Sequence, residues 1–158
     1  MPKLYLAWRR LDGASGHEVG RQLLTQQYET YVGGPMPEIR FAPKGKPYFA
    51  DASWHFSISH CQNHVFCLLA DRPVGIDAEE LDRKVSPKLA ARILSPGELA
   101  QWSVSSDPNK TLLSFWVLKE ADAKRSGEGI RLHPNHTDFT LPDSRIQEID
   151  GCILAVVT

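Results

Sequence analysis

Two apolar segments in the middle of the sequence, separated only by a turn, constrain the fold more than any other feature. Val65–Ala70 is a continuous apolar run of strand length, and Val74–Glu79 follows the turn residues Asp71-Arg72-Pro73. A short apolar run bounded by turn signals is typical of a buried strand. The two segments therefore predict a β-hairpin over Val65–Glu79, whose second strand ends in acidic residues.

The rest of the chain mixes strands and helices without a regular βαβ alternation, which favours an α+β fold in one domain. Ser86-Pro87 and Ser95-Pro96 each place an N-cap residue before a proline, and Glu98 completes capping-box spacing with Ser95. The expected strands are Leu4–Arg10, residues 38–41, Trp54–Ser59 and a hairpin within Asp138–Thr158; the expected helices are Gly16–Val32, two short ones after Pro87 and Pro96, and Thr111–Ser126, closed by Gly127 and Gly129.

Overall charge and composition exclude several classes of protein. The formal net charge of −1 gives no global field for nucleic acid or membrane, so an anionic ligand must be held by local placement of charges. No apolar run reaches the length of a transmembrane helix, and the apolar part of the N-terminus is too short for a signal peptide. Three cysteines cannot all pair, which suits a reducing compartment, so we expect a cytoplasmic protein.

Acidic residues recur beside predicted core segments. Asp77 and Glu79 are two apart in a strand and therefore share a face, while Glu120 and Lys124 lie one turn apart on a helix. Each pair has a simpler interpretation, namely a solvated strand end and an exposed ion pair. Taken together, three carboxylates favour a site for a hard cation such as Mg²⁺, and Lys124 beside it would suit a polyphosphate.

Cationic and hydrogen-bonding residues that could hold phosphate occur earlier in the chain. Lys44 and Lys46 flank a glycine on a short loop, which is either a phosphate-binding loop or an ordinary basic turn. Ser59 and His60 are adjacent in a strand and point to opposite faces, so they do not form a nucleophile and its base. Both can donate hydrogen bonds to an anion instead.

The cysteines and histidines offer a zinc site as a competing interpretation. His60, Cys61, His64 and Cys67 match no standard finger or knuckle spacing, and Cys67 lies in an apolar run. We therefore expect Cys67 and Cys152 to be small core residues. Glu98 is most simply a capping residue, with a supporting role at the acidic site as the open alternative.

The motifs, taken in order, resemble the 4′-phosphopantetheinyl transferase superfamily. The resemblance covers about Phe41 to Leu132 and lies in Gly45-Lys46-Pro47, Phe56-Ser57-Ile58-Ser59-His60, Gly75-Ile76-Asp77-Ala78-Glu79, Ser95-Pro96-Gly97-Glu98 and Trp116-Val117-Leu118-Lys119-Glu120-Ala121-Asp122-Ala123-Lys124, followed by Gly127-Glu128-Gly129. The first two motifs are weak signals alone. The glycine-isoleucine-aspartate strand and the tryptophan-lysine-glutamate helix in this order are specific.

The resemblance implies a fold, an activity and roles for individual residues. Members of the family move the phosphopantetheine arm of coenzyme A onto a serine of an acyl or peptidyl carrier protein and release adenosine 3′,5′-bisphosphate. Asp77, Glu79 and Glu120 would hold magnesium, with Glu120 and Lys124 serving catalysis. The coenzyme A phosphates would be contacted by Lys44, Lys46, Ser59, His60 and Lys124.

The length of chain before Gly75 implies the long, monomeric type of family member, with a shortened first half. Its fold would be two pseudo-symmetric α/β halves, approximately residues 1–70 and 71–158, packed together with the site between them. Two other functions stay open: a non-catalytic module that binds coenzyme A or a carrier protein, and a zinc-supported interaction domain.

Overall fold

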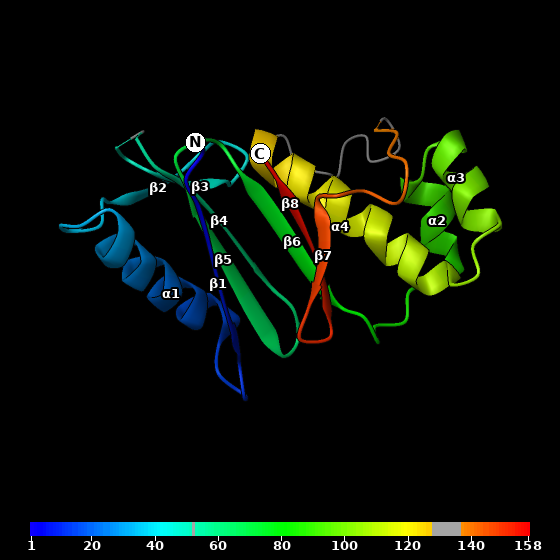
Figure 1. The fold of residues 1–158 in the computed structure, drawn as a ribbon, viewed down its shortest axis with the longest axis horizontal. Helices are drawn as coiled ribbons and strands as arrows, with labels where there is room; N and C mark the ends of the chain where they lie inside the picture. Colours follow the sequence, from blue (N-terminus) through cyan, green and yellow to red (C-terminus); the bar gives the residue numbers. More distant parts are fainter. Residues whose placement is uncertain (52, 128–136) are drawn as a thin grey trace.

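The computed structural model describes residues 1–51, 53–127 and 137–158, and Figure 1 shows their arrangement. Within these ranges the chain forms four helices and eight strands, and no helix is long and apolar enough to span a membrane. The helices are α1 (Gly16–Tyr31), α2 (Pro87–Ile93), α3 (Pro96–Ser103) and α4 (Pro108–Ser126). The strands are β1 (Leu4–Arg10), β2 (Ile39–Phe41), β3 (Pro47–Phe49), β4 (His55–His60), β5 (His64–Ala70), β6 (Gly75–Glu80), β7 (Ile146–Ile149) and β8 (Cys152–Val157).

The first sheet has the order β1-β5-β4 and is entirely antiparallel. Its central strand β5 is buried along its whole length, and successive side chains alternate between two cores. Val65, Cys67 and Leu69 pack toward α1, which covers this face with Leu23, Leu24 and other apolar residues. The sequence folds this way because α1 carries one apolar face and β5 carries two.

The second sheet has the order β6-β8-β7 and is covered by α4. Ile153, Ala155 and Val157 of β8 face α4, whereas Leu154 faces the first sheet. In each of these two three-stranded sheets the strand that comes first in the chain pairs with the last, and the last pairs with the one before it; β2 and β3 form a separate two-stranded sheet. A long helix follows the first strand in both cases, so the two sheets share one topology.

The hairpin predicted over Val65–Glu79 is wrong, although both of its strands form. β5 pairs with β1 and β4, and β6 pairs with β8, so β5 and β6 belong to different sheets. The hydrogen-bonding groups of β5 are taken on both edges, which leaves it no edge for β6. The actual hairpin is β4–β5, closed by the turn at residues 61–63.

The two sheets are joined by apolar packing and by two serine side chains. Phe66 and Leu68 of β5 form one core with Ile76 and Ala78 of β6. Beside this core, the Ser57 hydroxyl accepts a hydrogen bond from the Ile76 N–H (3.0 Å), and the Ser59 hydroxyl accepts one from the Ala78 N–H (3.1 Å). Serine hydroxyls of β4 thus satisfy the edge of β6 that faces the first sheet.

Most other expected elements are confirmed, with shifts at their ends. Ser86 and Ser95 cap α2 and α3, and Ser95 forms a complete capping box with Glu98. α4 begins at Pro108, three residues before the expected start, because Asp107 serves as its N-cap. It ends at Gly127 in the left-handed conformation, while Gly129 lies outside the described residues. The C-terminal hairpin is β7–β8, and β3 is a strand that the sequence pattern did not reveal.

Candidate active site

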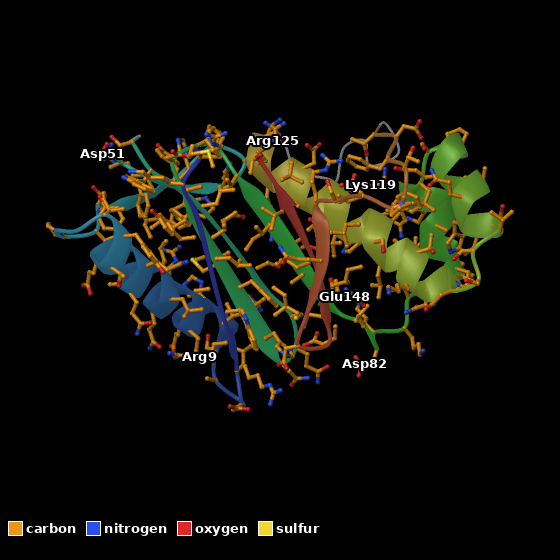
Figure 2. All side chains as sticks on the ribbon, viewed as in Figure 1. Arg9, Asp51, Asp82, Lys119, Arg125 and Glu148 are labelled. Atoms are coloured by element: carbon orange, nitrogen blue, oxygen red, sulfur yellow. The ribbon has the colours of Figure 1, made fainter. Side chains whose placement is uncertain are left out.

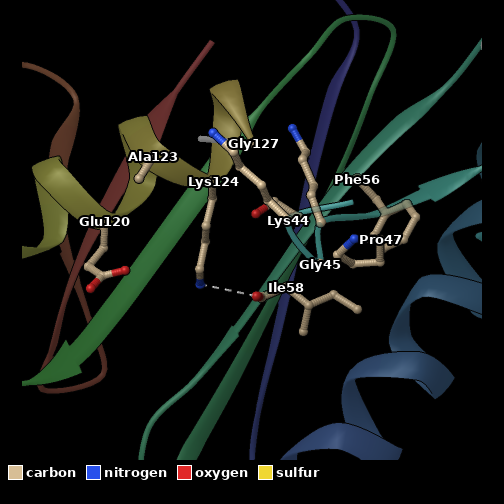
Figure 3. A pocket seen from close by; sticks show the side chains of 11 residues that line it. Lys44, Gly45, Pro47, Phe56, Ile58, Glu120, Ala123, Lys124 and Gly127 are labelled. Carbon is tan, nitrogen blue, oxygen red and sulfur yellow. Dashed lines mark hydrogen bonds between the residues drawn. The ribbon is translucent and has the colours of Figure 1, made fainter. Parts of the chain in front are cut away.

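A cavity of about 280 Å³ lies between the turn that joins β2 to β3, strand β4 and helix α4. Its walls come from the turn at residues 44–47 between β2 and β3, from Phe56–Ile58 of β4, and from the face of α4 between Glu120 and Gly127. Figure 3 shows Glu120 and Lys124 projecting from α4, with Lys44 on the turn that faces the helix. Residues 80 positions apart in sequence therefore line one cleft.

Three lysines make this cleft cationic. Lys44 and Lys46 come from the turn, and Lys124 comes from α4. The Lys46 ammonium donates to the Arg125 carbonyl oxygen at 2.7 Å, so it is held against the end of α4. Burial, and then the positive charge of Arg125, lower the pKa of Lys46. An anion bound in the cleft would oppose both effects, because its negative charge favours the protonated form of Lys46.

Asp77 is the buried acid at the junction of the two sheets, with only 8% of the residue exposed. Its Oδ1 accepts hydrogen bonds from the Ser59 hydroxyl (3.1 Å) and from the Lys124 ammonium (3.3 Å). Its Oδ2 is buried and has no partner among the described residues. Lys124 also donates to the Ile58 carbonyl oxygen at 3.3 Å, the contact drawn in Figure 3.

The surroundings of Asp77 raise its pKa to about 7. Burial is the main cause, and the negative charges of Glu120 and Glu79 act in the same direction. Lys124 and the hydrogen bond from Ser59 oppose the shift without cancelling it. Lys124 and Arg83 compensate the three acids only in part, and one Asp77 oxygen has no partner among the described residues, so the site suits an additional cation.

The three predicted magnesium ligands are close enough for the charges of Glu79 and Glu120 to act on Asp77, but their surroundings differ. Glu79 forms an ion pair with Arg83 and lines a second cavity of about 830 Å³, whereas Glu120 lines the lysine-rich cleft. Asp77 is buried and contacts Lys124, which lines the cleft. Within the described residues, a compact group of potential metal ligands lies around Cys61 and His64. The unpartnered oxygen of Asp77 and the all-oxygen donor set nevertheless fit the chemistry of Mg²⁺.

Gly75 explains how α4 comes close enough to β6 to form this site. A Cβ atom at this position would collide with the backbone of α4, at the Ala121 carbonyl oxygen and the Arg125 nitrogen. Only glycine allows this approach, because any side chain would push the helix away. From Gly75, strand alternation carries Asp77 to the α4 side of the sheet, next to Lys124.

Lys119 and Glu98 form a buried ion pair that holds α4 against α3. The Lys119 Nζ lies 2.7 Å from Glu98 Oε1, and the two side chains are 1% and 0% exposed. Lys119 also donates to the carbonyl and hydroxyl oxygens of Thr137. Figure 2 labels Lys119 on α4, next to the segment that precedes β7. The capping role expected for Glu98 is confirmed, and its supporting contact is to Lys119.

The remaining predicted ligands lie in different surroundings. Ser59 is buried and turned toward Asp77 and β6. His60, at the exposed end of β4, packs against Gly16 of α1 and lines the cavity that Glu79 also lines. Sequence reasoning missed Ser57 and Arg83. The polar alternation of β4 was the available signal for Ser57, and the i,i+4 spacing to Glu79 was the signal for Arg83.

Comparison with known proteins gives one consistent result. The sequence model of the 4′-phosphopantetheinyl transferase superfamily matches residues 73–154, just over half of the chain. The 4′-phosphopantetheinyl transferase gsp of Aneurinibacillus migulanus is 35% identical over 94 residues, covering 58% of this chain and 38% of that protein. The 4′-phosphopantetheinyl transferase of Bacillus subtilis is 30% identical over 112 residues, covering 63% and 50%.

A third relative, the 4′-phosphopantetheinyl transferase HetI of a Nostoc strain, is 33% identical over 122 residues. That alignment covers 70% of this chain and 51% of HetI. The chain thus spans about half or less of the length of these curated relatives.

Proposed function

Because the chain belongs to the 4′-phosphopantetheinyl transferase superfamily, we propose that it transfers the 4′-phosphopantetheine arm of coenzyme A to a serine of an apo acyl or peptidyl carrier protein. The observation that carries this proposal is the cleft itself. Lys44, Lys46 and Lys124 line it together with Glu120, and Asp77, whose Oδ2 is buried without a partner among the described residues, contacts Lys124 through Oδ1. Such a cleft suits a diphosphate and a reaction that moves one proton.

The transfer is a displacement at phosphorus. The serine hydroxyl oxygen of the carrier bonds to the phosphorus that bears pantetheine, and the bond from this phosphorus to the bridging oxygen breaks. Adenosine 3′,5′-bisphosphate leaves with the electron pair, and the hydroxyl proton passes to a carboxylate. Glu120 is our candidate for that carboxylate, because it lines the cleft on the same face of α4 as Lys124.

The lysines of the cleft would neutralise the diphosphate. Lys44 and Lys46 belong to the turn between β2 and β3, and Lys124 belongs to α4. We assign His60 to a coenzyme A phosphate outside the cleft, because it is exposed at the end of β4. Ser59 would act on Asp77 rather than on coenzyme A, since its hydroxyl is buried and already bonded to Asp77 and to the Ala78 N–H.

The proposal includes a magnesium ion that binds the diphosphate of coenzyme A. Asp77, Glu79 and Glu120 are the residues that would hold it, and when bound it would supply positive charge to the phosphate oxygens. The raised pKa of Asp77 supports this assignment, because the cause is burial together with the charges of the other two acids. Asp77 contributes an oriented oxygen, fixed by Ser59.

We further propose that residues 1–70 and 71–158 are two related halves of one domain and that the protein acts as a monomer. The shared strand order of the two sheets supports the relation. Both walls of the cleft come from one chain, so a second copy is not needed to complete it. The three free thiols are compatible with action in the cytoplasm.

Carrier modification measured by mass spectrometry tests the activity. The full chain is incubated with coenzyme A, magnesium and apo carrier proteins from fatty acid, polyketide and peptide synthesis, and a carrier gains one phosphopantetheine if the proposal holds. Glu120→Gln should lower the rate by a factor on the order of 10² to 10⁴, the usual contribution of a general base. Lys124→Met should lower the rate as well.

Two control variants keep the side-chain changes but lie outside the cleft. Lys110 and Glu148 form an exposed ion pair between α4 and β7, so Lys110→Met and Glu148→Gln should retain activity. If the protein modifies no carrier but calorimetry still shows that it binds coenzyme A, the enzyme proposal is wrong and the protein is a binding module. If Glu120→Gln keeps full activity, Glu120 does not accept the proton in the reaction.

A further inference from the structure

Four potential metal ligands converge at the end of the molecule where the turn at residues 61–63 meets β6 and β8. Cys61 follows β4, His64 begins β5, Glu80 ends β6 and Cys152 begins β8. One ligand atom from each lies within 4.8 Å of the others. Two of these residues come from the first sheet and its turn, and two come from the second sheet. Four positions scattered over 92 residues of sequence thus form one compact group.

The ligand types select the class of metal. Two thiols, one imidazole and one carboxylate suit zinc and related soft or borderline ions, which prefer tetrahedral nitrogen and sulfur ligands. Magnesium prefers oxygen ligands only, so this group is chemically different from the acids around Asp77. Cys67, the cysteine that the sequence spacing brought into consideration, points to the α1 core and takes no part.

His64 is held as metal-binding histidines usually are. Its Nδ1 lies 3.3 Å from Glu80 Oε1, inside the group, and its Nε2 lies 2.9 Å from Asp150 Oδ2, on the outer side. Asp150 is fixed in turn by two hydrogen bonds from Arg10, at 2.6 and 2.7 Å. A carboxylate on the outer nitrogen sets the tautomer and orientation of a ligating imidazole.

The Glu80 carboxylate is also positioned by the backbone. Its Oε1 accepts from the Asn63 N–H at 2.7 Å, and its Oε2 accepts from the Gln62 N–H at 3.2 Å. These contacts hold the turn at residues 61–63 against β6. They fix Glu80 between the backbone of the turn and His64, so little rearrangement is needed for it to bind an ion.

We propose that Cys61, His64, Glu80 and Cys152 bind one zinc ion, which links the two sheets. Binding would replace the thiol protons of both cysteines, because thiolate is the ligating form. None of the four ligands lines the lysine-rich cleft, whereas Cys61 and Glu80 line the second cavity together with His60 and Glu79.

Metal binding to the purified full chain tests this inference directly. Protein stripped with chelator and kept reduced should take up one zinc ion per chain by elemental analysis. With cobalt(II) it should give the near-ultraviolet thiolate bands and the intense visible bands of a tetrahedral site. Cys61→Ser and Cys152→Ser should lose the thiolate bands or weaken them, whereas Cys67→Ser should keep them. Asp150→Asn should weaken zinc binding by about 10- to 100-fold, as expected for loss of the outer carboxylate.

Circular dichroism of each variant distinguishes loss of ligand from loss of fold. If Cys152→Ser does not fold, the half-exposed Cys61 and the outer Asp150 still provide the test. Less than 0.1 zinc per chain together with no thiolate bands would overturn the inference, as would zinc uptake unchanged in Cys61→Ser. If the reduced protein takes up no metal and the oxidised protein contains a Cys61–Cys152 disulfide, the two cysteines form a redox pair and not a metal site. Transferase activity enters none of these outcomes.

Discussion

The buried pair Lys119–Glu98 gives the sharpest stability prediction. Both side chains are fully enclosed, and the ammonium and carboxylate lie 2.7 Å apart. Burial lowers the pKa of Lys119, and the hydrogen bond and charge of Glu98 oppose that change. Glu98 also accepts from the Ser95 N–H and the Phe139 N–H, both at 2.8 Å. The pair thus ties α4 to α3 and to the segment before β7.

Lys119→Met removes the positive charge but keeps most of the side-chain volume. The Glu98 carboxylate then stays buried without a counter-charge, which costs about 3–5 kcal/mol when one partner of a buried pair is removed. We expect a value near the lower end, about 3 kcal/mol, because the two backbone N–H groups still bond to the carboxylate. Such a loss is a large part of the roughly 5–15 kcal/mol that stabilises a typical domain. In the double variant with Glu98→Gln, the cost should be less than the sum of the two single costs.

Urea unfolding, followed by tryptophan fluorescence and circular dichroism, measures these free energies. Lys110→Met is the matched control, because Lys110 lies on the same helix in an exposed pair with Glu148. Such a surface pair contributes about 0–1 kcal/mol. Equal costs for Lys119→Met and Lys110→Met would refute the reasoning, and so would strict additivity in the double variant.

Two further predictions concern the contact of β6 with α4 and the acid limit of stability. Gly75→Ala should cost about 3 kcal/mol in the same urea assay, because overpacking against helix backbone cannot be relieved by a rotamer change; an unchanged midpoint would show that α4 can move without loss. Arg145 lowers the pKa of Asp143 by hydrogen bonding, so this pair stabilises the fold above the ordinary carboxyl pKa and the contribution disappears as pH falls through the lowered value. Asp143→Asn should therefore flatten the acid side of a plot of unfolding free energy against pH, and a slope equal to that of the wild type would contradict this assignment.

The sequence predicted local structure well where one short-range rule decides it. Alternation in β4 correctly separated Phe56 and Ile58, which pack toward α1, from Ser57 and Ser59. Cap chemistry located the starts of α2 and α3. These features depend on a few neighbouring residues, so they can be derived without knowledge of the rest of the fold.

Strand pairing could not be predicted in the same way. The turn at residues 71–73 has hairpin chemistry, yet β5 and β6 separate because β1 and β4 occupy both edges of β5. This choice depends on residues 60 positions away, and a local turn signal contains no information about it.

The candidate site was predictable in composition but not in its pairing of charges. Spacing alone brought Asp77 and Glu79 to one strand face and Glu120 and Lys124 to one helix face. The structure pairs Lys124 with Asp77 and Arg83 with Glu79, so the acids are partly compensated by the chain itself. The role of Lys119 could not be predicted from local spacing either, because its partner Glu98 belongs to another helix.

Asp77 links the site to the packing of the two sheets. One of its hydrogen-bond partners, Ser59, comes from the first sheet, and the other, Lys124, comes from the helix that covers the second. Ser59 also bonds to the Ala78 N–H, so separating the sheets would break the support of Asp77 and of β6 together. A carboxylate held from both sides loses its orientation when either side moves. The acid at the centre of the site is therefore oriented only while the two sheets stay packed.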